Sequence, residues 1–343
     1  MLTARRLFLV VACATALVTG FRFTAGAQPY NSPWAGPGGY QQDEYGPGGY
    51  GPGGYGPGGF RRGAFGRGGM GRGPGQELSI KVAGQTRTYI LIRPRSGRPL
   101  PTVVFMHGKG SSAERMRMTG FGRLGAREGF VTVFPNAVGG IWNIFPPGGP
   151  HPFGRRGDDT DFIQELVTSL VARGIADPDR IYISGISFGG FMALRMACVA
   201  PHLFAAVGVA LASMPSADGV ECRPAKPLPL VMIAGTADTT VPYAGGHTHA
   251  GFGIWGTDRT LAFFRRLNGC SDDEERSEIS LEERSETLPI KVHRWKHCRA
   301  PITLYSVIGG GHRAPRSMEP GAEGFTTAHA MWEFFRDKST RVQ

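Results

Sequence analysis

The sequence predicts an α/β domain whose central sheet is mainly parallel and carries helices on both faces. Three observations predict this fold class. Strands such as Thr102–Met106 and Leu230–Ala234 are continuous apolar runs, which is typical of parallel strands buried on both faces. Stretches with helical periodicity separate these runs. The turn Gly185–Gly189 also joins a short apolar strand directly to a helix, as expected where strands and helices alternate.

Local patterns place the elements within residues 76–343. An opening hairpin is expected because Glu77–Val82 and Thr86–Arg93 alternate on either side of Ala83-Gly84-Gln85. Buried strands are predicted at Thr102–Met106, Phe130–Phe134, Ile181–Ile183, Phe204–Leu211, Leu230–Ala234 and Ile302–Ile308. Helices are predicted at Ala113–Glu128, Asp158–Arg173, Phe191–Ala197, Asp258–Leu267 and Phe325–Asp337. Pro135–Gly157 is rich in glycine and proline and is expected to form a long loop.

A strand, a G-x-S-x-G turn and a helix follow one another around Ser187. In Gly185-Ile186-Ser187-Phe188-Gly189 the glycines permit a bend that is too tight for side chains, so the serine hydroxyl projects from it. The start of the following helix offers N–H groups to a developing negative charge. We therefore expect a nucleophile elbow at Ser187. The alternative is a glycine-rich turn with an incidental serine.

A serine nucleophile needs an imidazole to accept its proton and an acid to orient that imidazole. In a parallel sheet, catalytic groups gather at the carboxyl ends of the strands. Leu230–Ala234 leads into Asp238 and Ile302–Ile308 leads into His312, which predicts these residues as acid and base. The chain order Ser, Asp, His is that of the α/β-hydrolase fold. The competing residues that lack this strand-end placement are Asp218, Asp258, His247, His249, His293, His297 and His329.

The loop after the strand Thr102–Met106 is expected to complete the site. In this fold an oxyanion hole uses the N–H after the nucleophile and one from this loop, which predicts Phe188 and Lys109. His107 stands at the end of the strand and is expected to brace the loop rather than to transfer protons. His107, Trp142 and Asn143 are also candidates to line the substrate pocket.

The first 75 residues differ from the rest of the chain. Arg5 and Arg6 precede an apolar run that is shorter than the roughly 20 residues of a membrane span, so residues 1–27 are predicted to be a bacterial signal peptide cleaved after Ala27. The paired arginines resemble a twin-arginine export signal. Lipoprotein anchoring at Cys13 is the alternative. We therefore expect an exported protein, periplasmic or extracellular, without a transmembrane segment.

Residues 28–75 repeat Gly-Pro-Gly-Gly-Tyr and then alternate glycine with arginine. With almost no aliphatic side chains to bury, this stretch cannot offset the entropy lost on ordering, which predicts a disordered tether. The alternative is an adhesive segment that contacts the cell envelope or a polymer. Residues 76–343 are expected to form one catalytic domain.

The charge distribution favours no nucleic-acid partner. The chain carries a formal net charge of +11, but its basic residues are scattered and no nucleic-acid motif accompanies them. Asp272–Glu286 holds eight acidic residues and two arginines, which predicts a mobile, solvated loop. His247-x-His249 has no cysteine or carboxylate ligand at matching spacing, so we predict no metal site.

Four cysteines remain once Cys13 is set aside. An even number in an exported protein favours two disulfides, for which three pairings exist. We predict pairing between nearest neighbours in the sequence, which joins Cys198 to Cys222 and Cys270 to Cys298. Free buried thiols are the alternative.

Several motifs together resemble the secreted polyhydroxybutyrate depolymerase / feruloyl esterase family, a carbohydrate-esterase-like branch of the α/β-hydrolases. The resemblance covers about residues 77 to 337. Its motifs are Thr102–Gly110, Gly139–Asn143, Asp177–Tyr182, the elbow, Gly235–Tyr243 and Gly309–His312. It implies ester hydrolysis through an acyl-enzyme, without a cofactor, on a polyester or an esterified plant polysaccharide. It also implies both cysteine pairs.

Three residues depart from the family pattern. Phe188 replaces a frequent asparagine, while Lys109 and Ala314 stand where depolymerases usually have cysteine and tryptophan. Two other functions stay open. One is a serine peptidase of the prolyl-oligopeptidase type, which shares the elbow but has a propeller domain. The other is a non-catalytic surface protein that works through its repeat tether.

Overall fold

The computed structural model describes residues 75–146, 159–216, 222–283, 286–315 and 325–342. The chain divides into two units, Met1–Arg67 and Gly68–Gln343, and every described residue belongs to the second. The predicted signal peptide, residues 28–74 of the predicted tether, and Asp218 lie outside the described residues.

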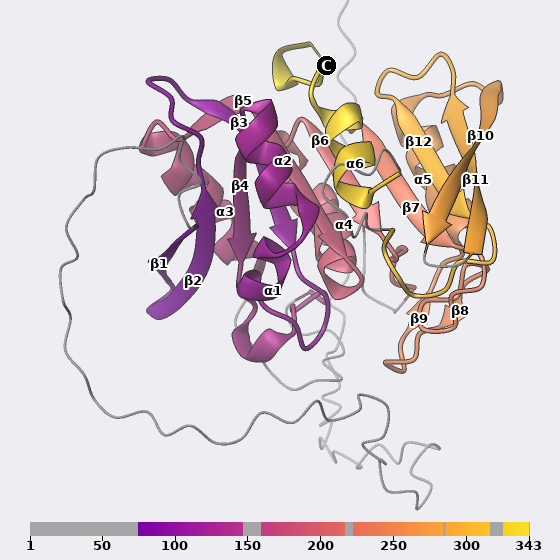
Figure 1. The fold of residues 1–343 in the computed structure, drawn as a ribbon, viewed down its shortest axis with the longest axis horizontal. Coiled ribbons are helices and arrows are strands. Elements are labelled where there is room, and N and C mark those ends of the chain that lie inside the picture. Colours follow the sequence, from indigo (N-terminus) through magenta and orange to yellow (C-terminus); the bar gives the residue numbers. More distant parts are fainter. Residues whose placement is uncertain (1–74, 147–158, 217–221, 284–285, 316–324, 343) are drawn as a thin grey trace, which may run out of the picture. The chain divides into compact units, whose positions relative to one another are not determined.

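A ten-stranded sheet organises the described part of the chain (Figure 1). Its strand order is β1-β2-β4-β3-β5-β6-β7-β12-β11-β10. Its strands are β1 (Gln76–Val82), β2 (Gln85–Ile92), β3 (Leu100–Met106), β4 (Val131–Pro135), β5 (Ala176–Ile186), β6 (Ala206–Ala210), β7 (Leu230–Gly235), β10 (Glu274–Glu283), β11 (Glu286–Trp295) and β12 (Ile302–Val307). The run from β4 to β12 is parallel throughout. Antiparallel pairs form both edges, so the predicted, mainly parallel sheet is confirmed.

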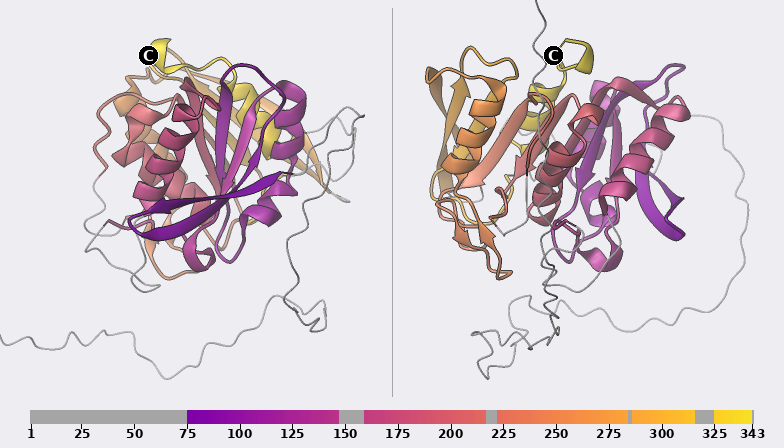
Figure 2. Two further views of the ribbon diagram at one scale, coloured as in Figure 1. Left: turned by 90° about the vertical axis from the view of Figure 1, so that its left-hand side faces the viewer. Right: turned by 180° about the vertical axis from the view of Figure 1, so that it is seen from behind.

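Helices cover both faces of the sheet (Figures 1 and 2). They are α1 (Ala113–Arg117), α2 (Gly120–Glu128), α3 (Asp159–Ala172), α4 (Phe188–Val199), α5 (Thr257–Asn268) and α6 (Thr327–Phe335). Successive residues of a strand point to opposite faces: Val104 and Met106 of β3 join a core with α3, α4 and α5, whereas Val103 and Phe105 join a core with α2 and α6. The continuous apolar runs of the sequence therefore fill two cores at once.

Some element bounds differ from those predicted. The helix expected at Ala113–Glu128 is divided into α1 and α2, because Thr119 adopts an extended conformation (ψ 170°) immediately before the second helix. Strand β5 begins at Ala176, before the predicted Ile181, with a change of register against β3 between these positions. Helix α4 begins at Phe188 rather than Phe191. The two-residue strands β8 (Gly246–His247) and β9 (Gly253–Ile254) and the 3₁₀ turns η1 (Val138–Gly140), η2 (Pro201–Leu203) and η3 (Thr340–Val342) complete the fold.

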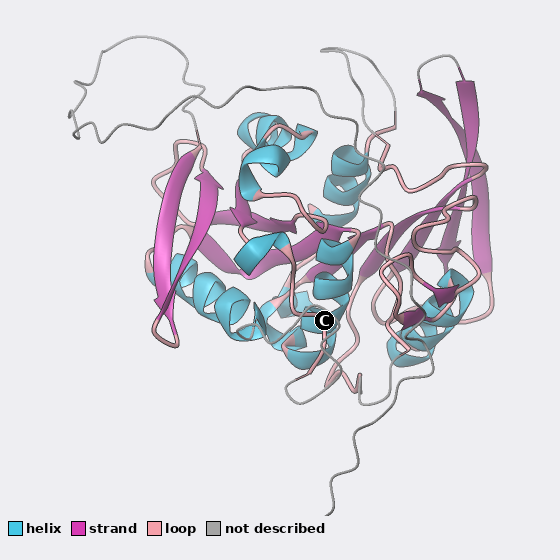
Figure 3. Ribbon diagram, turned by 90° about the horizontal axis from the view of Figure 1, so that it is seen from below, coloured by secondary structure: helices cyan, strands magenta, loops and turns pink. Residues whose placement is uncertain are grey.

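The prediction of a mobile loop at Asp272–Glu286 is wrong. Most of this segment forms β10, which pairs with β11 in an antiparallel hairpin at the edge of the sheet (Figure 3). Ile290 and Val292 of β11 are buried, while Glu275–Ser280 of β10 are exposed. Charged residues are common on edge strands, where they discourage pairing with other chains. The acidic composition marks an edge strand here rather than a loop.

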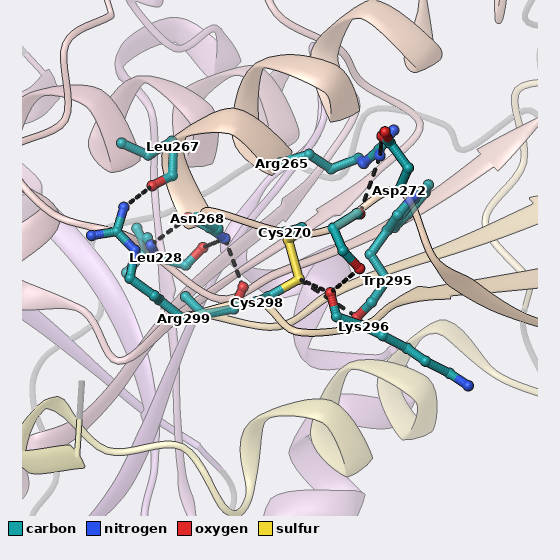
Figure 4. The surroundings of a disulfide bond; sticks show 12 residues. Leu228, Arg265, Leu267, Asn268, Cys270, Asp272, Trp295, Lys296, Cys298 and Arg299 are labelled. Carbon is teal, nitrogen blue, oxygen red and sulfur yellow. Dashed lines mark hydrogen bonds and ion pairs between the residues drawn. A yellow bond between two sulfur atoms is a disulfide. The ribbon is translucent and has the colours of Figure 1, made fainter.

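Both predicted disulfides are present, Cys198–Cys222 and Cys270–Cys298. Figure 4 shows Cys270 just after α5 and Cys298 in the connection between β11 and β12. Beside this bond the fully buried Asn268 side chain accepts from the Leu228 N–H (3.0 Å) and donates to the carbonyls of Leu228 (2.9 Å) and Ala300 (3.0 Å). These contacts tie α5 to the amino ends of β7 and β12, whose carboxyl ends lead to Asp238 and His312.

Candidate active site

The backbone at Ser187 has the strained geometry of an elbow. Ser187 lies between β5 and α4 with φ 54° and ψ −119°, a conformation that a residue other than glycine rarely adopts. A Cβ on Gly185 would lie 2.2 Å from the Gly189 carbonyl oxygen, and one on Gly189 would lie 2.1 Å from that of Met106. Both flanking positions therefore admit only glycine, as the G-x-S-x-G pattern predicted.

Ser187, His312 and Asp238 form one hydrogen-bonded chain. The His312 Nε2 lies 2.9 Å from the Ser187 Oγ, and its Nδ1 lies 2.7 Å from the Asp238 Oδ2. A carboxylate accepts hydrogen bonds, so the proton of a neutral imidazole is held at Nδ1 and Nε2 is left to accept from the serine. The structure thus brings together three residues that lie far apart in the sequence.

Backbone groups hold the Asp238 carboxylate in place. Its side chain is 2% exposed, and its Oδ1 accepts from the N–H groups of Thr240 and Val241, each at 2.8 Å. The other oxygen is directed at His312. The loop that carries His312 is tied to the Asp238 loop as well, because the Ala237 N–H donates to the Gly310 carbonyl at 2.9 Å.

The loop His107–Gly110 lies directly against the serine. A Cβ on Gly108 would be 3.4 Å from the Ser187 Cβ and 3.9 Å from its Oγ. The Gly110 N–H donates to the Gly140 carbonyl (2.9 Å), and the Ser111 N–H donates to the Gly108 carbonyl (3.2 Å). The exposed Lys109 follows Gly108 in this loop. The buried ring of Phe188, which follows Ser187 in the chain, packs edge-on against Phe191 and Phe252, each with centroids 5.8 Å apart.

The buried His107 side chain supports this loop through two hydrogen bonds. The residue is 1% exposed; Nδ1 lies 2.7 Å from the Gly108 carbonyl oxygen, and Nε2 accepts from the Ala137 N–H at 3.1 Å. Burial lowers the pKa of the His107 imidazole below its ordinary value, which outweighs the opposing effect of the bond to Gly108. The neutral ring matches these partners, because one nitrogen donates and the other accepts.

Trp142 and Asn143 are also held inside the protein. The Trp142 Nε1–H donates to the His107 carbonyl at 2.8 Å, and the Asn143 N–H donates to the Asp159 carboxylate at 2.6 Å. Both residues are buried. The pocket role expected for His107, Trp142 and Asn143 stays a prediction, and their placement favours support of the loop over contact with a substrate.

The competing candidates lie elsewhere. Asp258 is exposed in the first turn of α5, His247 and His249 are exposed in and beside β8, and His297 is exposed in the turn after β11. His293 lies 3.3 Å from Glu274 across the β10–β11 hairpin, and His329 lies 3.5 Å from Glu333 on α6. Within the described ranges, no group of three or more His, Cys, Asp or Glu side chains is arranged to hold a metal ion.

Sequence reasoning missed a polar network behind the loop. Arg87 of β2 and Asp159 of α3 form an ion pair at 2.5 Å, with side chains 3% and 2% exposed. Asn136 accepts from the Ala113 N–H at 2.7 Å and donates to the Thr88 hydroxyl at 3.0 Å. The available signal was weak: Arg87 stands between Thr86 and Thr88, ahead of the apolar run Tyr89–Ile92 of the same strand.

Comparisons with known proteins bear on the family and the fold of the chain. The family model described as the alpha/beta hydrolase family matches residues 103–336. The NocK protein of Nocardia uniformis subsp. tsuyamanensis is 37% identical over 176 residues, 48% of this chain and 49% of that protein. Feruloyl esterase B of Piromyces equi is 26% identical over 196 residues, 55% of this chain and 34% of that protein. Poly(3-hydroxyalkanoate) depolymerase C of Paucimonas lemoignei is 27% identical over 269 residues, 68% of this chain and 60% of that protein.

A solved structure shows the same fold. The acetyl xylan esterase from Aspergillus awamori superposes with a TM-score of 0.53 at 16% identity, over 76% of this chain and 99% of that one. The chain spans 34% to 60% of the length of the three relatives above. In the part of the chain that the structure covers, no helix is long and apolar enough to cross a membrane. The match over residues 103–336 decides the family: this chain belongs to the alpha/beta hydrolases.

Proposed function

We propose that the chain is a serine esterase that hydrolyses carboxylic esters through an acyl-enzyme on Ser187. The observation that carries this proposal is the hydrogen-bonded chain from Ser187 through His312 to Asp238 on a strained elbow. Such an arrangement can activate a serine hydroxyl at neutral pH.

The reaction follows from the positions of these atoms. His312 Nε2 accepts the Ser187 proton as Oγ attacks the ester carbonyl, and the tetrahedral intermediate collapses when His312 returns that proton to the departing alcohol. A water molecule then attacks the carbonyl of the acyl-enzyme while His312 accepts its proton. When the second tetrahedral intermediate collapses, His312 returns this proton to the Ser187 Oγ, and the carboxylic acid is released. The Asp238 carboxylate stabilises the imidazolium present in both halves.

The oxyanion donors in this proposal are the N–H groups of Phe188 and Lys109. Phe188 is the first residue of α4, and Lys109 follows the glycine that packs against Ser187. We call His107–Gly110 the oxyanion loop from here on. Donors fixed in advance stabilise the developing charge without reorganisation in the transition state, which often makes them the largest single contribution to catalysis.

The substrate proposed is a polyester or an esterified plant polysaccharide, with no cofactor. The family resemblance in the motifs supports both classes, and relatives named feruloyl esterase and poly(3-hydroxyalkanoate) depolymerase support them too. We also propose export by a cleaved signal at residues 1–27, with residues 28–75 as a tether. Two disulfides support export, since they persist in oxidising compartments.

A substrate panel tests this function. Wild-type protein is expected to hydrolyse p-nitrophenyl acetate and at least one of methyl ferulate, acetylated xylan and polyhydroxybutyrate, because all share the carboxylic ester. Ser187→Ala should abolish these activities while its circular dichroism stays that of the wild type. Cleavage of a prolyl p-nitroanilide with no ester hydrolysis would indicate the peptidase alternative. The absence of any Ser187-dependent turnover would favour the non-catalytic surface protein.

A further inference from the structure

The buried ion pair between Arg87 and Asp159 lies behind the active site and touches neither Ser187 nor His312 in any bond described above. Burying two charges costs desolvation energy, and an apolar pair of similar volume is often at least as stable. A contribution to stability therefore does not by itself explain why these two charges are buried. We propose that the Arg87–Asp159 pair positions the oxyanion loop through the segment Asn136–Asn143, and this proposal rests on the function proposed above.

The ion pair holds both ends of Asn136–Asn143. At one end, the Arg87 guanidinium donates to the Asn136 carbonyl at 3.2 Å. At the other end, the Asp159 Oδ2 accepts from the Asn143 N–H at 2.6 Å, while its Oδ1 is bound to Arg87 at 2.5 Å. The guanidinium also lies 4.0 Å from the centroid of the Phe162 ring on α3, which fixes its plane. The ion pair therefore connects β2 and α3 to both ends of the segment.

The segment between these ends makes three hydrogen bonds to the oxyanion loop. The Ala137 N–H donates to the His107 Nε2 (3.1 Å), the Trp142 Nε1–H donates to the His107 carbonyl (2.8 Å), and the Gly140 carbonyl accepts from the Gly110 N–H (2.9 Å). Two of these bonds hold His107, the first residue of the loop, and the third holds Gly110, its last residue. Lys109, whose N–H is the proposed donor, lies between them.

A displacement of the segment Asn136–Asn143 would consequently also displace the Lys109 N–H. Without the pair, the Asn143 N–H and the Asn136 carbonyl each lose a charged partner. The Asn136 end keeps its hydrogen bonds to Thr88 and Ala113, so we expect the Asn143 end to shift more. Misplacing a catalytic group by about 1 Å can cost about a hundredfold in rate. Because the triad is held by other loops, we expect substrate binding and the Ser187–His312 bond to be little affected. Arg87 and Asp159 are thus positioning residues.

The decisive variant replaces both charges at once. Arg87→Met alone removes one member of a buried ion pair and keeps the buried Asp159 carboxylate, which is expected to be destabilising, whereas Arg87→Met/Asp159→Leu removes both charges and is expected to melt close to the wild type. The double variant still lacks the charged partner at each end of the segment. We therefore expect its kcat on p-nitrophenyl acetate to be about a hundredfold lower, with KM within about twofold of the wild type. Hydrogen exchange should become faster at the Gly110 and Ala137 amides, a readout that needs no turnover.

Asn268→Ala provides the matched control for lost stability. It removes three buried hydrogen bonds at the amino ends of β7 and β12, away from the strand ends that carry the site, so it should lower the melting temperature and leave kcat unchanged. A double variant with wild-type kcat and wild-type exchange at Gly110 would overturn the proposal, since the pair would then serve stability alone. A wild-type protein that turns over no ester would refute the proposed function instead, while the exchange experiment would still report whether the pair holds the loop.

Discussion

Replacing His312 with alanine is expected to lower kcat by roughly a millionfold, leaving only the residual rate that the oxyanion hole and binding supply. In the proposed mechanism the imidazole has two tasks, accepting the Ser187 proton and returning it to the leaving group, and no other side chain in the described contacts bridges Ser187 to a carboxylate. Single-turnover and steady-state kinetics on p-nitrophenyl acetate measure the loss, and the melting temperature verifies that the variant is folded.

The Asp238→Asn variant should lose less, about 10⁴-fold in kcat, because the base remains but is held in the wrong tautomer. Asp258→Asn is the matched control. This carboxylate is exposed on α5, and its loss should leave kcat within about twofold, as for a surface substitution remote from the site. If Asp218→Asn in folded protein proved far more harmful than Asp238→Asn, the acid would be wrongly assigned.

The Gly189→Ala variant is expected to show the largest loss of stability. A methyl group there would lie 2.1 Å from the Met106 carbonyl oxygen and 2.7 Å from that of His107, both backbone atoms that have little room to move. Helix α4 must then shift away from the end of β3. Overpacking of this kind costs about 3 kcal/mol, which corresponds to a fall in melting temperature of roughly 10 °C for a domain of this size. The shift also displaces the oxyanion loop, so kcat should fall in the protein that remains folded.

Gly97→Ala tests whether the effect is local. A Cβ on Gly97 would meet no atom within 4 Å, and this glycine is exposed before β3. Its melting temperature and kcat should match those of the wild type. A Gly189→Ala protein that is as stable and as active as the Gly97→Ala protein would show that the elbow is not packed as tightly as the structure indicates.

The sequence was sufficient for the sheet and for the placement of the triad candidates because both follow local rules. Continuous apolar runs identify parallel strands buried on both faces, and strand ends mark where polar groups gather. Asp238 and His312 could therefore be placed by the strands that precede them, although Ser187 lies 125 residues before His312. The disulfides were predictable because each pair is close in sequence, with separations of 24 and 28.

The features that were missed left weak or misleading signals in the sequence. The segment Asp272–Glu286, which contains β10, was taken for a loop because of its many charges. Strand β11 was not predicted, although Ile290 and Val292 are buried while Lys291 between them is exposed. The division of Ala113–Glu128 into two helices depends on one extended residue, Thr119. The pair Arg87–Asp159 joins residues 72 positions apart, and no local pattern indicates that one buried charge will meet another.

The central claim is that Ser187 is the nucleophile, and a serine-directed fluorophosphonate tests it most directly. Intact-mass and peptide analysis of the wild-type protein should show one adduct, at Ser187, formed in step with the loss of ester hydrolysis. The His312→Ala protein should react far more slowly, because its serine keeps its proton. An adduct at another residue, or full ester turnover by protein that is completely labelled at Ser187, would contradict the account.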